Sequence, residues 1–134
     1  MKKALMVLTA ITSVITISAM AAEDIIVCPA PSSIHMKADG DRFAYYADEN
    51  GYHFVQKFNF LKHKKPIGQI GEVAIYPLSN SYGQLACNYA RATMWLSGNV
   101  TPVGSNWLPA QTGTYTCDTG GVNTICVATA NTVN

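Results

Sequence analysis

Four cysteines constrain the fold of this chain more than any other feature of its 134-residue sequence. An even number of cysteines in an exported protein indicates disulfide bonds, which small exported domains need for stability. No two of the four form the Cys-x-x-Cys pair typical of a zinc site, and complete pairing leaves no thiol for catalysis. We therefore expect no metal site and two disulfides, which join Cys28, Cys87, Cys117 and Cys126.

The first residues indicate export to a compartment in which such bonds form. Two lysines precede an uncharged run over residues 4–17, and Ala19-Met20-Ala21 then supplies the small residues that a signal peptidase requires. We predict a signal peptide over residues 1–21, with cleavage after Ala21 or Ala22, and one periplasmic or secreted domain over residues 22–134. An uncleaved anchor is disfavoured because Thr and Ser dilute a run close to the minimum spanning length of about 18 residues.

Cleavage also changes the charge of the protein. Two of the nine basic residues lie in the signal and none of the eight acidic ones do, so the exported domain is slightly acidic. A near-neutral domain has no general attraction to nucleic acid or to anionic membranes. We expect no nucleic-acid partner and no stable membrane insertion after cleavage.

Four cysteines allow three pairings, and local geometry favours one of them. The segment between Cys117 and Cys126 contains Gly120-Gly121 and is typical of a hairpin. A two-residue turn at Gly121-Val122 would place the two cysteines opposite each other, whereas a turn at Gly120-Gly121 would displace them by two residues. We favour Cys117–Cys126, with Cys28–Cys87 as the second bridge.

The clearest hairpin runs from Arg42 to Phe58. Asn50-Gly51 at its centre is the strongest two-residue turn signal, because both positions require a positive φ. Counting outward from this turn places Phe43 opposite Phe58. The face expected to pack in the core then contains Phe43, Tyr45, Ala47, Phe54 and Phe58.

Further apolar runs predict strands over residues 25–28, 33–37, 72–76 and 84–96, with a closing hairpin over 113–130. The segment 97–111 contains several Gly and Pro residues and is expected to be a loop. We count about seven short strands and no helix. The fold class that this pattern favours is all-β, a small antiparallel β-sandwich or barrel with two disulfides.

Two features suggest a surface that binds a partner. The run Lys62-His63-Lys64-Lys65 is the main charge cluster, and could bind an anionic surface or the acidic cleft of another protein. Trp107 lies in a polar loop, where an exposed indole would suit sugar stacking or a protein contact. We assign Lys62, Lys64, Lys65 and Trp107 to binding of a protein or glycan ligand. The alternatives are a solvated lysine loop and a tryptophan that folds back onto the core.

No motif for catalysis is recognisable. The chain contains no G-x-S-x-G, P-loop or H-E-x-x-H sequence, and its three histidines lack the spacing of metal ligands. We expect no enzyme activity and no cofactor. A glycosidase needs two carboxylates about 5–10 Å apart in a cleft, and the carboxylates that could form such a pair are Asp39, Asp41, Asp48, Glu49, Glu72 and Asp118.

Two short motifs support a family resemblance. With Cys28-Pro29 soon after the signal and Cys87-Asn88-Tyr89 later, the chain resembles small exported gammaproteobacterial proteins of an uncharacterised domain family, of the type found in Legionella-like bacteria. The resemblance implies export and no assigned activity.

Three functions are consistent with these observations. The leading one is an exported, non-enzymatic binding protein. The second is a secreted inhibitor of a lysozyme or protease, since disulfide-bonded β domains can insert a rigid loop into an enzyme. The third is a small hydrolase that uses one of the possible carboxylate pairs.

Overall fold

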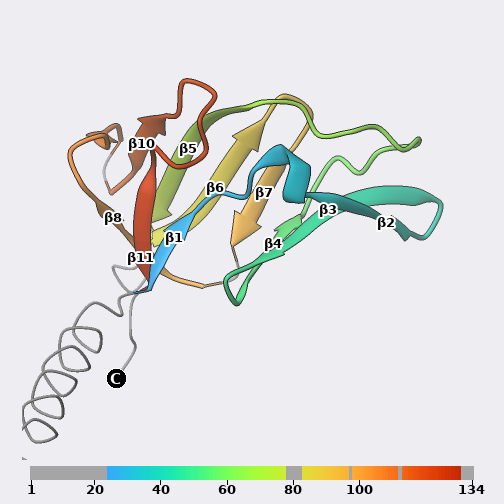
Figure 1. The fold of residues 1–134 in the computed structure, drawn as a ribbon, viewed down its shortest axis with the longest axis horizontal. Helices are drawn as coiled ribbons and strands as arrows, with labels where there is room; N and C mark the ends of the chain where they lie inside the picture. The colour runs from blue at the N-terminus through green and yellow to red at the C-terminus, as the bar shows by residue number, and fades with distance from the viewer. Residues whose placement is uncertain (1–23, 78–82, 97, 112, 131–134) are drawn as a thin grey trace, which may run out of the picture.

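The computed structural model describes residues 24–77, 83–96, 98–111 and 113–130, so the predicted signal peptide lies outside the described residues. Within these ranges the protein is all-β, and every paired strand runs antiparallel to its neighbour. The strands form one curled sheet with the shape of a half-barrel (Figure 1). The predicted fold class is confirmed.

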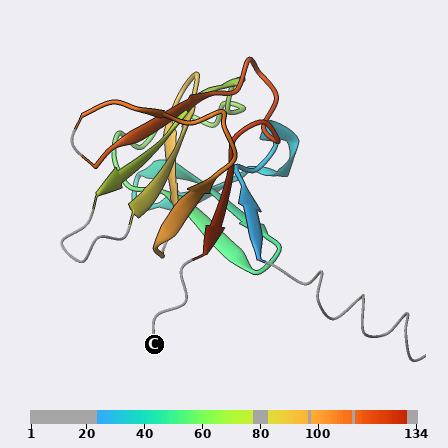
Figure 2. The ribbon, with the colours of Figure 1, turned by 90° about the vertical axis from the view of Figure 1, so that its left-hand side faces the viewer.

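The strand order along the main path of the sheet is β1-β11-β8-β6-β7-β4-β3-β2, and β6 also pairs with β5, which leads to β10 and β9. Figure 2 shows how the sheet curls, with β1, β11 and β8 side by side. A 3-10 turn, η1 (Pro31–Ser33), follows β1. The strands are β1 (Ile25–Val27), β2 (His35–Asp39), β3 (Arg42–Glu49), β4 (Tyr52–Gln56), β5 (Ile70–Pro77), β6 (Gly83–Tyr89), β7 (Thr93–Leu96), β8 (Val100–Val103), β9 (Leu108–Pro109), β10 (Tyr115–Asp118) and β11 (Val127–Ala130).

The described residues contain more strands than the sequence pattern predicts. The expected single strand over 84–96 is a hairpin, because the chain turns after Tyr89, whose N–H donates to the carbonyl of Ala92 at 2.8 Å. No Gly or Pro marks that turn in the sequence. The expected loop over 97–111 contributes β8 and β9.

The Asn50-Gly51 turn forms as predicted, with positive φ at both residues, and Ala47 lies opposite Phe54. The predicted register is observed as far as Tyr46 opposite Val55. Leu61 takes the position opposite Phe43, and the residues between form a loop that projects from the sheet. The prediction that Phe58 lies in the core is therefore wrong.

Both favoured disulfides are present, Cys28–Cys87 and Cys117–Cys126. The closing hairpin that supported the second pairing is wrong, however, because β10 pairs with β5 and β9 while β11 pairs with β1 and β8. The chain between them makes two successive turns, at Thr119 and at Val122. The Cys117–Cys126 bridge therefore joins two separate parts of the curled sheet.

The core fills the inside of the curled sheet. Alternate residues of the strands point into it, as the period of two in a β-strand requires. Both disulfides are buried there. The largest fully buried apolar side chains are those of Tyr45, Phe54, Val73, Ile75, Leu85, Met94, Leu96 and Val100. No helix of the described residues is long and apolar enough to cross a membrane.

Candidate functional site

The tryptophan assigned to ligand binding lies in the core. Trp107 is 7% exposed, and its indole N–H donates to the carbonyl of Val127 at 2.8 Å. The prediction of an exposed ring is wrong, and the alternative, in which the ring folds back onto the core, is confirmed. Asn106 beside it donates to the carbonyl of Ile125, so the polar part of this loop also bonds to the chain before β11.

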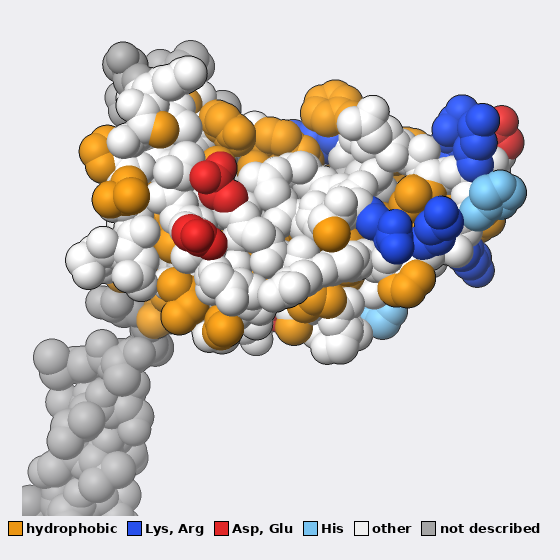
Figure 3. Space-filling model, turned by 90° about the horizontal axis from the view of Figure 1, so that it is seen from above, with side chains coloured by type: hydrophobic (Ala, Val, Ile, Leu, Met, Phe, Trp, Pro, Cys, Tyr) orange, Lys and Arg blue, Asp and Glu red, His pale blue; other side chains and the backbone are white. Residues whose placement is uncertain are grey.

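The three lysines assigned to binding are exposed on the loop between Leu61 and Ile67. Lys and Arg side chains gather at one end of the molecule in Figure 3, whereas β8 lies towards the opposite end in Figure 1. The structure therefore does not bring Trp107 together with Lys62, Lys64 and Lys65.

Lys64 and Lys65 form the rim of a shallow depression of about 340 Å³, which we call the basic groove. The Tyr45 hydroxyl at its base donates to the carbonyl of Lys65, and the Lys65 N–H donates to the Met36 sulfur at 3.3 Å. Burial raises the pKa of Tyr45, against the opposing effect of Arg91, so its hydroxyl stays a donor. The other residues of the groove are apolar: Pro31, Ile34, Met36, Pro66 and Ile67.

A second depression, of about 330 Å³, lies where the loop after β4 meets the β6–β7 turn, and we call it the aromatic hollow. Three aromatic residues line it, Phe58, Tyr89 and Trp95; Tyr89 is buried, whereas Phe58 is 64% exposed. The polar side chains that line it are Asn59, Arg91 and Thr93. Its remaining lining residues are Ala90 and Ala92.

A buried amide holds Phe58 in this exposed position. Gln56 is only 5% exposed, and its side-chain nitrogen donates to the carbonyls of Phe58 and Asn59, at 2.9 and 3.0 Å. Its side-chain oxygen accepts the N–H of Tyr45 at 3.0 Å. Asn59 adopts a positive φ of 59°. The loop is thus a hydrogen-bonded structure, and it directs an apolar ring away from the core.

Trp95 lies on the outer face of the sheet. Ala86, opposite it on β6, is fully buried, which indicates that the indole lies across it. The ring centroid of Tyr76 lies 5.8 Å from that of Trp95, and the Lys57 ammonium nitrogen lies 5.0 Å from the Trp95 centroid. Aromatic and cation–π neighbours of this kind hold a ring in a defined orientation.

The polar groups of the hollow are also held by neighbours. The Thr93 hydroxyl donates to the side-chain oxygen of Asn88 at 2.6 Å, and Nε of Arg91 donates to the carbonyl of Pro66 at 2.9 Å. The guanidinium has further N–H donors on its terminal nitrogens. The hollow therefore combines aromatic walls with positioned polar groups, as small-molecule sites do.

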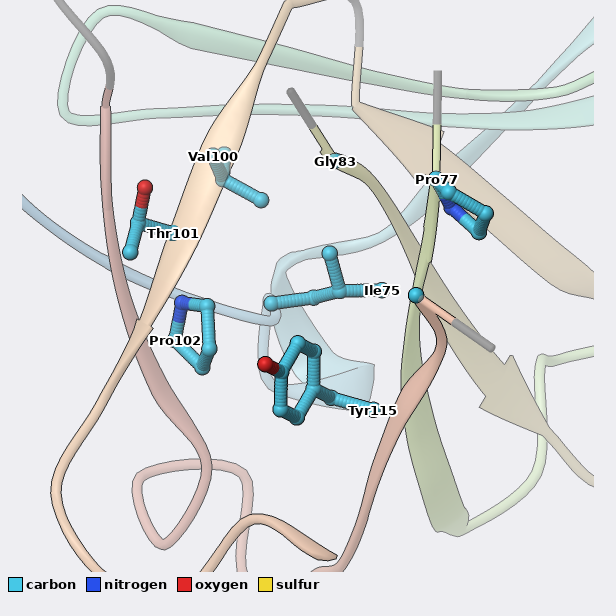
Figure 4. A pocket seen from close by; sticks show the side chains of 8 residues that line it. Ile75, Pro77, Gly83, Val100, Thr101, Pro102 and Tyr115 are labelled. Carbon is cyan, nitrogen blue, oxygen red and sulfur yellow. The ribbon is translucent and has the colours of Figure 1, made fainter. Parts of the chain in front are cut away.

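A third hollow, of about 430 Å³, opens where β5 and β10 diverge from β8, because β6 meets β8 only at Gly83 and Val100. Figure 4 shows Ile75 and Val100 reaching into it, with the Tyr115 ring at one side. Its described lining includes no charged side chain. We assign it no ligand, since it resembles an incompletely filled part of the core.

The carboxylates considered for hydrolysis are spread over the surface. Glu72 and Asp118 lie opposite each other on β5 and β10, but both are exposed, and no carboxylate lines any of the three hollows described above. Asp48 pairs with His53 across the β3–β4 hairpin, as the register predicts. Within the described ranges, no group of His, Cys, Asp and Glu is arranged to hold a metal ion.

Sequence reasoning missed Phe58, Arg91 and Trp95 as a group. The one signal that could have revealed the hollow is Gln56, a polar residue on the hairpin face that otherwise points into the core. Comparisons with protein-family models, with curated proteins and with solved structures found no match.

Proposed function

We propose that the protein is an exported, non-enzymatic carbohydrate-binding protein and that the aromatic hollow is its sugar site. The observation that supports this most is the position of Phe58, which is 64% exposed yet held by a buried amide. A buried polar side chain is favourable only when its hydrogen bonds are satisfied. Here the hydrogen bonds of Gln56 keep the Phe58 ring on the surface, where it contributes little to the packing of the core.

The chemistry of the hollow matches that of a pyranose ring. A sugar has faces of C–H groups that stack on aromatic rings, and hydroxyl groups around its edge that need hydrogen-bond partners. Phe58 offers an exposed aromatic surface and Trp95 the exposed part of a half-buried indole, while Asn59, Arg91 and Thr93 offer polar groups. A volume of about 330 Å³ lies at the lower end of the range for small-molecule sites, about 300–1,000 Å³.

Export is supported by two independent features. The sequence begins with a predicted signal peptide, and the described residues form two disulfides, which persist in oxidising compartments. Glycans are abundant ligands outside the cytoplasm.

The two tryptophans make a specific test possible, because Trp95 lines the hollow and Trp107 is buried in the core. We would titrate the purified protein with cellohexaose, chitohexaose and maltohexaose and record tryptophan emission. At least one sugar should shift the emission. The shift should vanish in a Trp95→Phe variant and persist in a Trp107→Phe variant.

Phe58→Ala should weaken sugar binding about tenfold, because tenfold corresponds to about 1.4 kcal/mol and burial of a Phe side chain contributes at least that much. Leu108→Ala is the matched control, since Leu108 is 67% exposed on β9. Equal affinities of the Phe58→Ala variant and the native protein would contradict the proposal. So would binding of a thymidine dodecanucleotide with no response to any sugar, which would indicate a nucleic-acid site.

A further inference from the structure

The basic groove differs from the aromatic hollow in shape and chemistry. Three aliphatic residues that are buried or half-buried line it, Ile34, Met36 and Ile67, and we call them its floor. The exposed residues Lys64 and Lys65 also line it, and we call them its rim. We propose that this groove is a second binding site, which takes a fatty acid with its chain on the floor and its carboxylate at the lysines.

The polar groups at the base of the groove already have partners. The Tyr45 hydroxyl donates to the carbonyl of Lys65, and the Lys65 N–H donates to the Met36 sulfur. A ligand part that rests on this floor therefore meets few groups able to form new hydrogen bonds. A peptide backbone would leave N–H and C=O groups unpaired there, at a cost, whereas an alkyl chain has none to satisfy.

The charge around the groove favours an anionic head group. Lys62 lies on the same loop as the two rim lysines, and Arg42 donates to the carbonyl of Phe60 at the start of that loop. No acidic residue lines the groove. The Lys64 ammonium lies 5.6 Å from the centroid of the Phe43 ring, so it is close to the protein surface.

Both walls of the groove are anchored, so the site exists before a ligand arrives. On one side, η1 follows Cys28, which is bonded to Cys87, and the Tyr89 hydroxyl donates to the carbonyl of Pro29. On the other side, Arg91 donates to the carbonyl of Pro66. Preformed walls reduce the ordering cost of binding.

The test is titration calorimetry of the purified protein with dodecanoate below its micelle-forming concentration. Dodecyltrimethylammonium has the same chain with a cationic head, and a hexaglutamate peptide has negative charge without a chain. Dodecanoate should bind at least tenfold more tightly than either. Equal binding of the two dodecyl compounds would overturn the proposal, and so would binding of hexaglutamate alone or of none of the three.

Variants locate the site. Lys64→Gln and Lys65→Gln should each weaken dodecanoate binding about fivefold, the effect expected of an exposed charge pair. Lys57→Gln, an exposed lysine beside Trp95, is the matched control and should have no effect. Equal affinity in all three variants would place the fatty acid elsewhere and overturn the assignment.

Two further measurements separate this site from others. Phe58→Ala should leave dodecanoate affinity unchanged, so a failure of the sugar proposal does not decide this one. Should the lysine variants not fold, salt provides the alternative test, because 0.5 M NaCl screens exposed charges and should weaken dodecanoate binding severalfold. If the affinity for dodecanoate did not fall in 0.5 M NaCl, the lysines would not bind its carboxylate and the proposal would be wrong.

Discussion

The backbones of Phe43 and Leu61 exchange two hydrogen bonds, with N–O distances of 2.8 and 2.9 Å. Gln56, at the end of β4, donates from its buried amide to the carbonyls of Phe58 and Asn59. These bonds together close residues 57–60 into a loop that leaves the sheet and returns to it. The aromatic hollow depends on this loop, since Phe58 and Asn59 belong to the loop and line the hollow.

Phe58 and Phe54 should differ sharply in their contribution to stability. Phe54 is fully buried, so Phe54→Ala should lower the free energy of unfolding by about 3–5 kcal/mol. Phe58→Ala should change it by less than about 0.5 kcal/mol, because the ring is exposed. Urea unfolding followed by circular dichroism measures both. A loss of several kcal/mol in the Phe58 variant would mean that its ring packs in the core.

Gln56→Leu should damage both the fold and the proposed sugar site. The substitution removes three hydrogen bonds, each of which contributes about 1 kcal/mol. The free energy of unfolding should therefore fall by about 3 kcal/mol. Sugar affinity should fall as well, because the loop that presents Phe58 loses its support. Gln84→Leu, on a half-buried glutamine of β6, is the control. Unfolding midpoints that match between the two variants would exclude this role for Gln56.

The two disulfides should contribute unequally to stability. Cys28 and Cys87 are 59 residues apart in the sequence, whereas Cys117 and Cys126 are 9 apart. In the chain-entropy model a longer closed loop restricts the unfolded chain more, which gives about 4 kcal/mol for the first bridge and about 3 kcal/mol for the second. Paired Cys→Ala variants, compared by urea unfolding, check the order. The reverse order would show that native packing at Cys117–Cys126 outweighs chain entropy.

Trp107→Phe should destabilise the protein more than Trp95→Phe does. The first substitution leaves the partly buried carbonyl of Val127 without its indole donor, a loss of about 1 kcal/mol, and it leaves space where the larger buried indole packed. Trp95 is only half-buried, so its loss should have a smaller effect. Iodide quenching provides a second measure, because in the native protein it should reach Trp95 and not Trp107. Strong quenching in the Trp95→Phe variant would contradict the buried position of Trp107.

Stability should fall at alkaline pH, in part through Tyr89. Burial, with a smaller effect of the Glu49 carboxylate, raises the pKa of the Tyr89 hydroxyl above its usual value of 10.0. Below pH 10 the Tyr89 hydroxyl keeps its proton in both the folded and the unfolded state, so its contribution to the free energy of unfolding does not change with pH. Above pH 10 the Tyr89 hydroxyl loses its proton in the unfolded state while the folded state still keeps it, which favours unfolding. The free energy of unfolding therefore falls as the pH rises from 10 to the pKa of Tyr89 in the folded protein.

Tyr89→Phe removes this titration, so its unfolding free energy should decline less steeply between pH 9 and pH 11 than that of the native protein. Tyr115→Phe is the control, because Tyr115 is exposed on β10. Parallel pH profiles for the Tyr89→Phe variant and the native protein would contradict the role of Tyr89.

Local sequence patterns predicted the parts of the fold that depend on neighbouring residues. The Asn50-Gly51 turn formed because few residues other than Asn and Gly accept a positive φ at both positions. The apolar runs over 25–28 and 72–76 predicted strands that the structure contains as β1 and β5. The disulfide Cys117–Cys126 is present as predicted, but the hairpin from which it was predicted does not form, because β10 and β11 pair with other strands.

The candidate site was not predictable in the same way. Its residues come from the loop after β4, the end of β6, the β6–β7 turn and β7. These segments lie close together because β7 pairs with both β4 and β6, and no local pattern specifies those pairings. A two-residue period continued through Phe58 predicts an inward ring, and Gln56 is the one residue of that face of β4 that departs from the apolar pattern.

The sequence by itself determined the all-β class, the β3–β4 hairpin and the identity of the four disulfide-forming cysteines. These follow from backbone preferences, from the period of two along a strand and from cysteine number. Only the tertiary structure decided that Leu61 lies opposite Phe43, that Phe58 is exposed and that Trp107 is buried. Each of these depends on hydrogen bonds between residues distant in the sequence or in different strands, such as Gln56 with Tyr45 and Trp107 with Val127, and no local pattern specifies such partners.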